Sequence, residues 1–355
     1  MNLKAFTKRI RRALRHKERK STLKILKEYF WLKLTKPLLA EQYFIKPLYR
    51  EDAGEINNYI NTNRLHKKYW DINEEHFTPA FEMKDNFEKY LSQFGINVVK
   101  TLAYNHKAIF VQNGKLKLIG TPEEFLGFIN SLPVEKAIFI KKKEDSFGGK
   151  NIFKVTPEQL KEDRELLNKI YSEVIKAGYI YQNQIIQHDE MNKINPNSIN
   201  CVRIVTYTNK DKIPRILGIT QKASLSEAYV DNVSFGGGFI PLDMENGILY
   251  DKICTGFEKN TGEVYYKHPV TGFKPKGFRI PYFREAKELA LYAAKSVPQI
   301  ILVGWDMAIT PDGPLIIEGN IRPGLNDHEI AQKGFRNNPV YLNLLEDTNE
   351  KPIYS

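Results

Sequence analysis

This sequence has little cysteine and no long apolar run. Its two cysteines, Cys201 and Cys254, are too few for a disulfide-stapled scaffold or a four-cysteine zinc site, and they favour a reducing compartment. No apolar stretch approaches the ~18–20 residues that a membrane-spanning helix requires. The first residues show no apolar core followed by a small-residue cleavage site, so no secretory signal is indicated. We therefore expect a cytoplasmic protein.

Glycine and proline are also not abundant, with 22 and 18 residues among 355. Together with 42% hydrophobic and 27% charged residues, this composition excludes a fibrous chain and a largely disordered one. A chain of this length has room for two or three domains at ~100–200 residues each.

The net charge of +11 belongs to one segment of the chain. Residues 1–36 hold 13 lysines and arginines but only two acids, Glu18 and Glu28, whereas the remaining residues hold 40 bases and 40 acids. The body of the protein is therefore formally neutral. It also lacks basic clusters with interleaved aromatic residues, which disfavours a nucleic acid as the partner.

The basic segment, residues 1–38, has the pattern of amphipathic helices. Leu3, Phe6, Ile10 and Leu14 recur at intervals of three and four, which places an apolar stripe on one side of a helix. A second apolar set follows at Leu23, Leu26, Tyr29, Phe30 and Leu34. Three interpretations stay open: a helix packed on the body with its bases in solvent, peripheral contact with an anionic membrane, or binding to nucleic acid or an acidic helix.

The rest of the chain reads as an α+β protein. Residues 39–100 are polar with short helical patterns, which is typical of a small lead-in domain. Further on, short strand-like runs alternate with helical ones. Thr121 and Thr156 each precede Pro-Glu, an N-cap residue followed by the proline favoured at the first helical position. The pattern predicts a mostly antiparallel sheet with packed helices.

Residues 301–324 carry the strongest local signal, a hairpin. Two apolar runs flank Pro-Asp-Gly at 311–313, a turn sequence. If these three residues form the loop, Asp306 lies opposite Glu318, and Asn320 shares their face. A loop of another length would shift this register.

Two directly opposed carboxylates repel each other unless a cation lies between them. A ligand set of oxygen atoms without His or Cys suits Mg²⁺ or Mn²⁺. The alternatives are two solvated acids or one protonated partner.

Two further segments carry chemistry. In residues 136–155 a glycine loop joins two strand-like runs, so that Ser146, Gly148 and Gly149 can turn backbone N–H groups toward an anion, with Lys141 and Lys150 beside it. The alternative is a simple hairpin turn. Arg203 lies inside the apolar run 202–205 and needs a carboxylate or phosphate partner there. A structural ion pair would also satisfy it.

In combination these segments resemble the ATP-grasp superfamily. The stretches IIQHDEMNKINPNSINCVRIVTY (185–207), KHPVTGFKPKGFRIP (267–281) and VGWDMAITPDGPLIIEGNIRPG (303–324) look like its sugar-transfer-associated branch. The resemblance covers about residues 80–340 and leaves out the basic N-terminal segment. It implies two α+β subdomains that clasp ATP: residues 101–185 with a glycine-rich lid and the catalytic, metal-binding residues 186–345, followed by a tail, 346–355.

The resemblance also implies the nucleotide and metal ligands. Lys141 and Lys84 would contact ATP phosphates, and the loop from Ser146 to Lys150 would cover them. Residues 181–184 would form the hinge against adenine, although Gln182-Asn183 replaces the usual Glu-Glu pair of the family. The remaining implied nucleotide contacts are Gln184 and His188, and the implied metal ligands are Asp306, Glu318 and Asn320.

The implied reaction is an ATP- and Mg²⁺-dependent ligation of a carboxylate to an amine through an acyl phosphate. Arg203 and the backbone N–H of Gly324 would stabilise the reacting oxygens. Arg322 and His328 are further candidates, with a surface position as the alternative. Asn232 and Ser234, near the glycine run 234–239, would line the acceptor side.

The branch name implies a sugar or glycan substrate in cell-surface polysaccharide assembly, modified through an amide. The basic N-terminal segment would suit an enzyme that works beside a lipid-linked or anionic glycan, at the inner face of the membrane. One alternative is a phosphotransferase that moves phosphate to a hydroxyl or to a catalytic histidine, for which His188 and His268 are the candidates. Another is a non-catalytic nucleotide-binding accessory protein.

Overall fold

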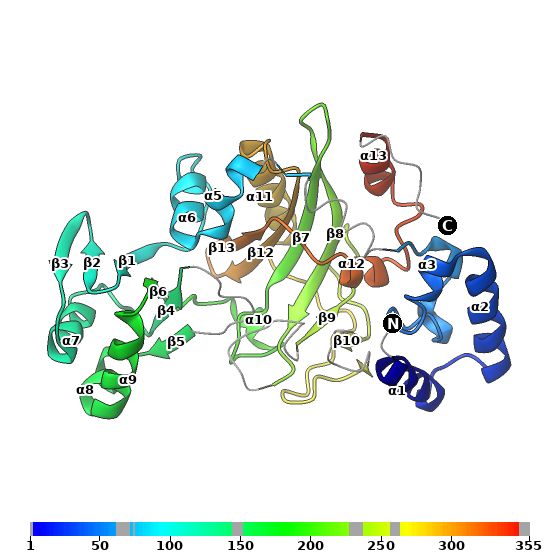
Figure 1. Ribbon diagram of the computed structural model, residues 1–355, viewed down its shortest axis with the longest axis horizontal. Helices are drawn as coiled ribbons and strands as arrows, with labels where there is room; N and C mark the ends of the chain where they lie inside the picture. The colour runs from blue at the N-terminus through cyan, green and yellow to red at the C-terminus, as the bar shows by residue number, and fades with distance from the viewer. Residues whose placement is uncertain are drawn as a thin grey trace.

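The computed structural model describes residues 3–61, 72–73, 75–143, 152–226, 237–255 and 263–347 (Figure 1). They form an N-terminal helical unit, a six-stranded sheet and a seven-stranded sheet. Every pair of neighbouring strands in the two sheets is antiparallel, which confirms the predicted sheet type. Within these ranges no helix combines the length and the apolarity that crossing a membrane would require.

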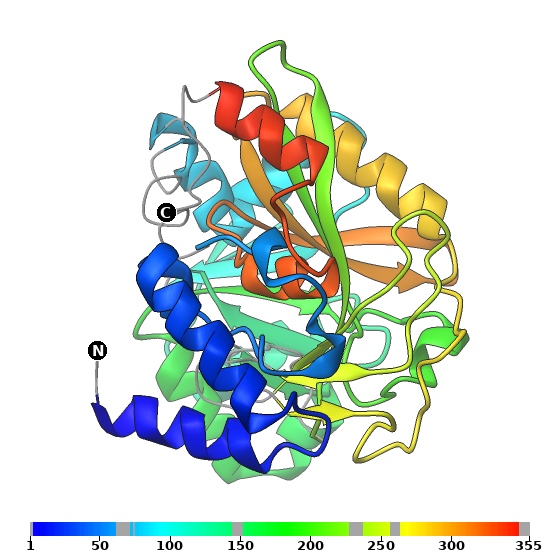
Figure 2. The same ribbon diagram turned by 90° about the vertical axis from the view of Figure 1, so that its right-hand side faces the viewer.

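The N-terminal helical unit lies at the right-hand end of the molecule in Figure 1, and Figure 2 looks onto this end. It contains α1 (Leu3–Arg15), α2 (Thr22–Thr35), α3 (Pro37–Ala40) and the 3-10 turns η1 (Glu51–Ala53) and η2 (Ile56–Asn58). Its core joins residues from both sides of position 38: Ala13, Ile25, Leu32, Leu39, Ala40, Tyr43, Leu48, Tyr49 and Tyr59. The basic segment and the first part of the range 39–100 therefore pack as one unit.

A buried ion pair fixes this unit to the rest of the protein. Lys46 Nζ contacts Glu329 Oε2, and both side chains are fully buried. Lys46 also donates to the carbonyl of Ile60 at 2.5 Å, and Glu329 Oε1 accepts from the Ile60 N–H at 2.7 Å. Each charge is thus surrounded by hydrogen-bond partners, as a buried pair requires.

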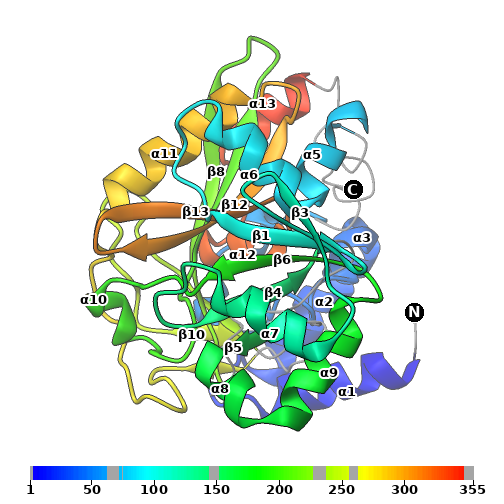
Figure 3. The ribbon, with the colours of Figure 1, turned by 90° about the vertical axis from the view of Figure 1, so that its left-hand side faces the viewer.

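The six-stranded sheet, which we call the small sheet, has the order β3-β2-β1-β6-β4-β5 (Figure 3). Its strands are β1 (Thr101–His106), β2 (Ile109–Gln112), β3 (Lys115–Leu118), β4 (Ile138–Lys142), β5 (Ile152–Val155) and β6 (Gly178–Asn183). Helices α7 (Pro122–Asn130), α8 (Pro157–Glu162) and α9 (Arg164–Val174) supply the apolar residues that bury one face. Thr121 and Thr156 cap α7 and α8, as predicted.

The seven-stranded sheet, which we call the large sheet, has the order β11-β10-β9-β8-β7-β12-β13. Its strands are β7 (Val202–Thr208), β8 (Pro214–Ala223), β9 (Gly238–Ile240), β10 (Ile253–Thr255), β11 (Val264–Tyr265), β12 (Leu302–Thr310) and β13 (Gly313–Asn320). A short helix, α10 (Asp189–Asn192), precedes it.

Both faces of the large sheet are covered by helices. On one face, side chains such as Ile204 and Trp305 share a core with α11 (Phe283–Ser296). On the other face, Val205 and Leu217 pack with residues of the segment that contains α12 (Asn326–Ala331) and α13 (Pro339–Asp347). Because side chains alternate along a strand, Arg203 points to the same face as Val205.

The second part of the range 39–100 belongs to the core of the large sheet. It forms η3 (Glu75–Phe77), α5 (Pro79–Glu82) and α6 (Lys84–Ser92), whose residues Phe81, Phe87 and Leu91 join the core with Trp305 and Ile316. The lead-in range is thus divided between two cores.

The β12–β13 hairpin differs from the prediction in its turn. Thr310 pairs with Gly313, so the loop has two residues, Pro311 and Asp312, and the expected three-residue loop is wrong. A bulge at Ile317 adds one residue to β13 between the pairs Met307–Ile316 and Asp306–Glu318. The bulge compensates for the shorter loop, so the predicted pairing of Asp306 with Glu318 is confirmed.

Candidate active site

A row of charged side chains crosses four neighbouring strands of the large sheet. Asp306 on β12 pairs in register with Arg203 on β7 and with Glu318 on β13. Lys222, on β8, extends the row on the far side of Arg203. The sheet therefore brings two bases and two acids together on one face.

Asp306 is the centre of this row and is 3% exposed. Arg203 donates from Nη2 to Oδ2 at 2.6 Å and from Nε to Oδ1, so the guanidinium contacts both carboxylate oxygens. Lys222 Nζ lies 3.4 Å from Oδ2. Burial opposes ionisation of Asp306, but the charges of Arg203 and Lys222 outweigh it and hold its pKa well below the usual value.

Glu318 has the opposite electrostatic environment. Burial raises its pKa, and the negative charge of Asp306 raises it further. Asn320 Nδ2 donates to Glu318 Oε1 at 3.2 Å, which holds the amide beside the two carboxyl groups, as predicted. Of the two acids, Asp306 therefore loses its proton more readily, and Glu318 keeps its proton to a higher pH.

The donor set fits a hard divalent cation. Two carboxyl groups and one amide converge here. Among the described residues, no three His, Cys, Asp or Glu side chains are placed so that they could hold a metal ion together, so the protein would supply only these two carboxyl groups. Mg²⁺ and Mn²⁺ prefer such oxygen ligands, and Mg²⁺ commonly uses only one or two carboxylates from the protein. Asp306, Glu318 and Asn320 are therefore the residues that could hold the metal.

A glycine at position 304 lets Pro323 lie close to β12, next to Arg203. Gly304 lies between Asn320 and Val205 in the sheet. A Cβ atom at this position would lie 2.8 Å from Pro323 Cβ and 3.4 Å from Arg203 Cδ. Any side chain at position 304 would therefore displace Pro323, and with it the segment that leads to Gly324.

The small sheet and α6 supply a second group of cations. Lys141 on β4 donates from Nζ to Gln182 Oε1 on β6 at 3.0 Å. Burial lowers the pKa of Lys141 to about 8, while the charge of Glu318 acts in the opposite direction. Lys84, at the start of α6, has its pKa lowered by burial and is also influenced by Glu318. Both ammonium groups thus interact electrostatically with Glu318 of the large sheet.

The predicted hinge residues face different ways. Gln182 is buried and donates to Thr101 Oγ1 at 3.3 Å, on the same side as Lys141. Asn183 instead donates to the carbonyl of Pro133 at 3.1 Å, and the Gln184 N–H donates to the carbonyl of Ala137 at 2.8 Å. Asn183, which stands where the family usually has its second Glu, therefore contacts a neighbouring loop.

Two histidines proposed for chemistry are engaged in local structure. His188 Nδ1 accepts from the Glu190 N–H at 3.1 Å and caps α10. His268 is 1% exposed, donates from Nε2 to the carbonyl of Ser224 at 2.7 Å, and accepts at Nδ1 from two backbone N–H groups at 3.2 Å. Neither ring belongs to the charged row.

The segment after β13 contains the other predicted residues. Gly324 is exposed and has open space at its Cβ position. Arg322 is exposed and lies 3.8 Å from Glu82, which agrees with the surface alternative. His328 is 1% exposed, so a surface position is wrong for it. Burial and the charge of Arg203 lower the pKa of His328 to about 3, so the ring is neutral.

Several predicted residues lie outside the described residues, and Lys222 was not predicted. Those outside are Ser146, Gly148, Gly149 and Lys150 of the lid and Asn232 and Ser234 of the acceptor side. The only sequence signal for Lys222 is a lysine that follows the mostly apolar run 216–221. Its importance comes from Asp306, 84 positions away in the chain.

The chain is similar to one described protein family. A family model with the description sugar-transfer associated ATP-grasp matches residues 63–340, which is most of the chain. No curated protein matches it.

Three solved structures show weaker likeness. They are an N5-carboxyaminoimidazole synthase from Aspergillus clavatus (12% identity, TM-score 0.42, covering 84% of this chain and 60% of that one), the VanG D-Ala:D-Ser ligase from Enterococcus faecalis (16%, 0.42, 77% and 62%) and the D-alanine-D-alanine ligase from Coxiella burnetii (14%, 0.37, 78% and 54%). This chain thus spans less than two thirds of the length of each. The family assignment rests on the sequence match at residues 63–340.

Proposed function

We propose that this chain, which belongs to the sugar-transfer associated ATP-grasp family, is an ATP- and Mg²⁺-dependent ligase that joins a carboxylate to an amine. The observation that carries the proposal is the charged row Lys222–Arg203–Asp306–Glu318, with Lys141 and Lys84 near it. Cations on two sides of a carboxyl pair suit a reaction between negatively charged substrates, because each charge must be stabilised during the approach.

The first step of the proposed reaction transfers the γ-phosphoryl group. A carboxylate oxygen of the substrate attacks the γ-phosphorus of ATP, and the bond from that phosphorus to the β,γ-bridging oxygen breaks. ADP leaves, and the substrate becomes an acyl phosphate. Mg²⁺ held by Asp306, Glu318 and Asn320 would neutralise charge on the phosphate oxygens. Lys141 and Lys84 would bind and orient the phosphates.

The second step forms the C–N bond. The amine attacks the acyl carbon, inorganic phosphate leaves with the C–O electron pair, and the amine loses a proton. Arg203 is held in place by its two contacts with Asp306, which orients the guanidinium before substrate binds. We propose that Arg203, the exposed N–H of Gly324 and, less directly, Arg322 stabilise the developing oxyanion.

The family description supports a sugar or glycan as one substrate, modified with an amino acid or a similar amine in the assembly of cell-surface polysaccharide. A phosphotransferase would move phosphate to a substrate hydroxyl or to a histidine such as His188 or His268. Both rings make local hydrogen bonds, which disfavours the histidine route, and product analysis separates the ligase from a phosphotransferase that acts on a hydroxyl.

We further propose that the enzyme works at the inner face of the membrane and contacts it through α2. The apolar stripe predicted on α1 is at least partly used inside the protein, because Phe6 packs on Tyr29 and Phe44. In contrast, Leu23, Leu26, Phe30 and Leu34 of α2 are 64%, 47%, 60% and 86% exposed.

Helix α2 is apolar on two sides, since Ile25 and Leu32 are buried in the N-terminal core. A helix that is apolar on two sides requires a second cover. Lys24, Lys27 and Lys33 accompany the exposed stripe within a segment of net charge +11. A second copy of the chain would place like charges against each other, whereas an anionic membrane complements them.

Product analysis tests the proposed chemistry. With Mg²⁺ and ATP, a ligase releases ADP and free phosphate only when both a carboxylate and an amine are present. A phosphotransferase produces ADP with one acceptor and no free phosphate, and an accessory protein produces no ADP. Sugar acids paired with amino acids are the first substrates to screen, after calorimetric titration has established Mg²⁺-dependent binding of a non-hydrolysable ATP analogue.

A further inference from the structure

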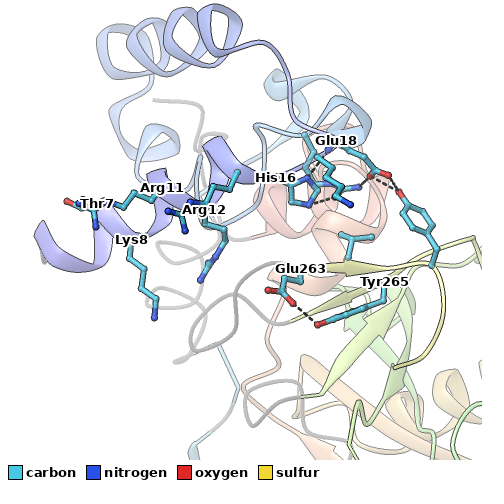
Figure 4. A pocket seen from close by; sticks show the side chains of 13 residues that line it. Thr7, Lys8, Arg11, Arg12, His16, Glu18, Glu263 and Tyr265 are labelled. Carbon is cyan, nitrogen blue, oxygen red and sulfur yellow. Dashed lines mark hydrogen bonds and ion pairs between the residues drawn. The ribbon is translucent and has the colours of Figure 1, made fainter. Parts of the chain in front are cut away.

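A large cavity lies between the basic helix α1 and strand β11, at the end of the molecule away from the small sheet (Figure 4 and Figure 1). Its volume is about 1160 Å³. Bases of α1 form one wall, and residues 263–266 form the other. This volume is at the upper end of the range of small-molecule sites in proteins.

The register of α1 directs its bases into this cavity. Lys8, Arg11, Arg12 and Arg15 all line it, and their spacing of three, one and three residues places them on one face of the helix. Phe6 and Ala13 point to a different side, where they pack with the other N-terminal helices. The helix is therefore held by its apolar side, and its charged side faces the cavity.

Like charges at these spacings repel each other within the helix. No described carboxylate lies within ion-pair distance of Lys8, Arg11, Arg12 or Arg15. Burial lowers the pKa of Arg12, and the charges of Tyr49 and Glu263 offset this effect only in part.

The two acids at the cavity are already engaged. Glu18 accepts from Arg50 Nη2 at 2.7 Å and from the Tyr266 hydroxyl at 2.6 Å. Glu263 accepts from the Tyr265 hydroxyl at 2.6 Å. Four bases of α1 line the cavity against these two carboxylates, and Glu18 is already paired with Arg50, so the described residues leave an excess of positive charge here.

The opposite wall is aromatic. Tyr265 and Tyr266 line the cavity together with Val264. The hydroxyl groups are fixed by Glu263 and Glu18, so the rings are held in place. Planar rings opposite a row of guanidinium groups suit a ligand that has an anionic group at one end and a ring at the other.

We propose that this cavity binds an organic phosphate, with the phosphate group on Lys8, Arg11, Arg12 and Arg15 and a sugar-like ring on Tyr265 and Tyr266. Guanidinium groups match phosphate oxygens in pairs, and several adjacent cations favour a dianion or diphosphate over a single carboxylate. The site is separate from the charged row of the large sheet and does not depend on the proposed ligase activity. The same chemistry occurs in a soluble sugar phosphate and in the headgroup of a phospholipid.

Calorimetric titration of the full-length protein with inorganic diphosphate and with glucose 1-phosphate tests the site. A saturating Mg²⁺–ATP analogue is present to occupy the catalytic site. We expect Arg11→Gln and Arg12→Gln each to weaken binding of both probes about tenfold, the loss typical of one charge-assisted contact. Arg9→Gln is the matched control, since it removes the same charge from the same helix but does not line the cavity. Tyr265→Leu should weaken glucose 1-phosphate more than diphosphate.

Vesicles distinguish the two sources of phosphate. Sedimentation with phosphatidylcholine vesicles that contain phosphatidylglycerol is compared for Arg12→Gln and Arg9→Gln. A selective loss for Arg12→Gln only with vesicles would assign the ligand to a lipid, and a selective loss only with soluble probes would assign it to a soluble phosphate. Equal affinities of Arg11→Gln, Arg12→Gln and Arg9→Gln in all assays, with unchanged thermal unfolding, would overturn the proposal.

Discussion

Arg203 and Asp306 lie directly opposite each other on neighbouring strands, and the guanidinium contacts both oxygens of the carboxylate. This arrangement divides the two acids of the site into different roles. Asp306 is ionised and positions Arg203, while the pKa of Glu318, on its other side, is raised by burial and by the charge of Asp306. Substitutions of the two acids should therefore have different consequences for folding.

We expect Glu318→Gln to remove turnover and leave the fold intact. The amide is isosteric with the protonated carboxyl group, so it keeps the neutral charge state that burial favours. It cannot supply a negatively charged metal ligand, and kcat should fall about 10²–10³-fold, as for loss of one preorganised electrostatic contact. Release of ADP and phosphate measures the first effect, and thermal unfolding measures the second. Full activity with Mg²⁺ would contradict the metal assignment.

Asp306→Asn should instead destabilise the protein. It leaves Arg203 and Lys222 without the carboxylate that compensates their charges, and breaking a largely buried pair in this way costs about 3–5 kcal/mol. Urea unfolding of this variant beside Glu318→Gln makes the comparison direct. Equal stabilities of the two variants would show that Asp306 does not have the structural role assigned to it.

Nucleotide affinity should decrease as the pH rises through about 8, the pKa to which burial lowers Lys141. The neutral amine formed above this pH no longer attracts phosphate. The sign for stability is opposite: between pH 8 and the usual lysine pKa of about 10.5, only the unfolded chain keeps the proton at this position, so the stability of the nucleotide-free protein rises.

Lys141→Arg provides the control for this pH dependence. Arginine keeps its charge across the whole range. The variant should bind an ATP analogue with an affinity that no longer falls near pH 8, as measured by calorimetry at several pH values. A fall that persists in this variant would assign the titration to a different group.

Membrane contact through α2 is tested with vesicles of phosphatidylcholine with and without phosphatidylglycerol. Replacing Leu26, Phe30 and Leu34 by Ser should weaken binding to the anionic vesicles by more than about tenfold, because each large apolar side chain contributes about 1.5–3 kcal/mol when buried. Added salt should weaken binding of the unsubstituted protein.

The matched control for α2 is Leu116→Ser with Leu118→Ser on β3. These leucines are 74% and 73% exposed but lie on the small sheet, away from the basic segment. If the control loses as much binding as the α2 variant, the contact is a general effect of exposed apolar residues. Dimerisation of the unsubstituted protein that the α2 substitutions abolish would identify a second copy as the partner.

Lys46→Met should cost about 3–5 kcal/mol, because Glu329 then remains as a buried acid without a cation. Adding Glu329→Leu should recover much of this loss, as apolar residues can replace buried ion pairs. Urea unfolding of both variants and of the unsubstituted protein measures these differences in the free energy of unfolding. A double variant no more stable than Lys46→Met would show that the hydrogen bonds of Glu329 matter more than the pair.

The sequence predicted the opposed acids because their hairpin is local: Asp306 and Glu318 are joined by a short turn whose residue types are specific. The prediction succeeded despite an incorrect loop length, since the bulge at Ile317 compensates for it. Bulges leave no clear trace in a single sequence. Lys222 and the burial of His328 could not be predicted, because both depend on contacts with strands far away in the chain.

The N-terminal segment shows a second limit. The apolar residues of α2 recur on two sides of the helix, so periodicity does not show which side packs inward. The stripe on α1 was easier to recognise but is not the most exposed one. Only the position of the N-terminal core, built around Tyr43 and Tyr49, distinguishes Ile25 from Leu26.

The buried pair of Lys46 and Glu329 also constrains how this protein can evolve. The family match begins at residue 63, so it includes Glu329 and excludes Lys46. The portion shared with relatives would therefore, on its own, hold a buried acid whose counter-charge comes from outside it. We expect the two positions to change together, so that members of the family without an equivalent N-terminal segment carry an uncharged residue at the position of Glu329.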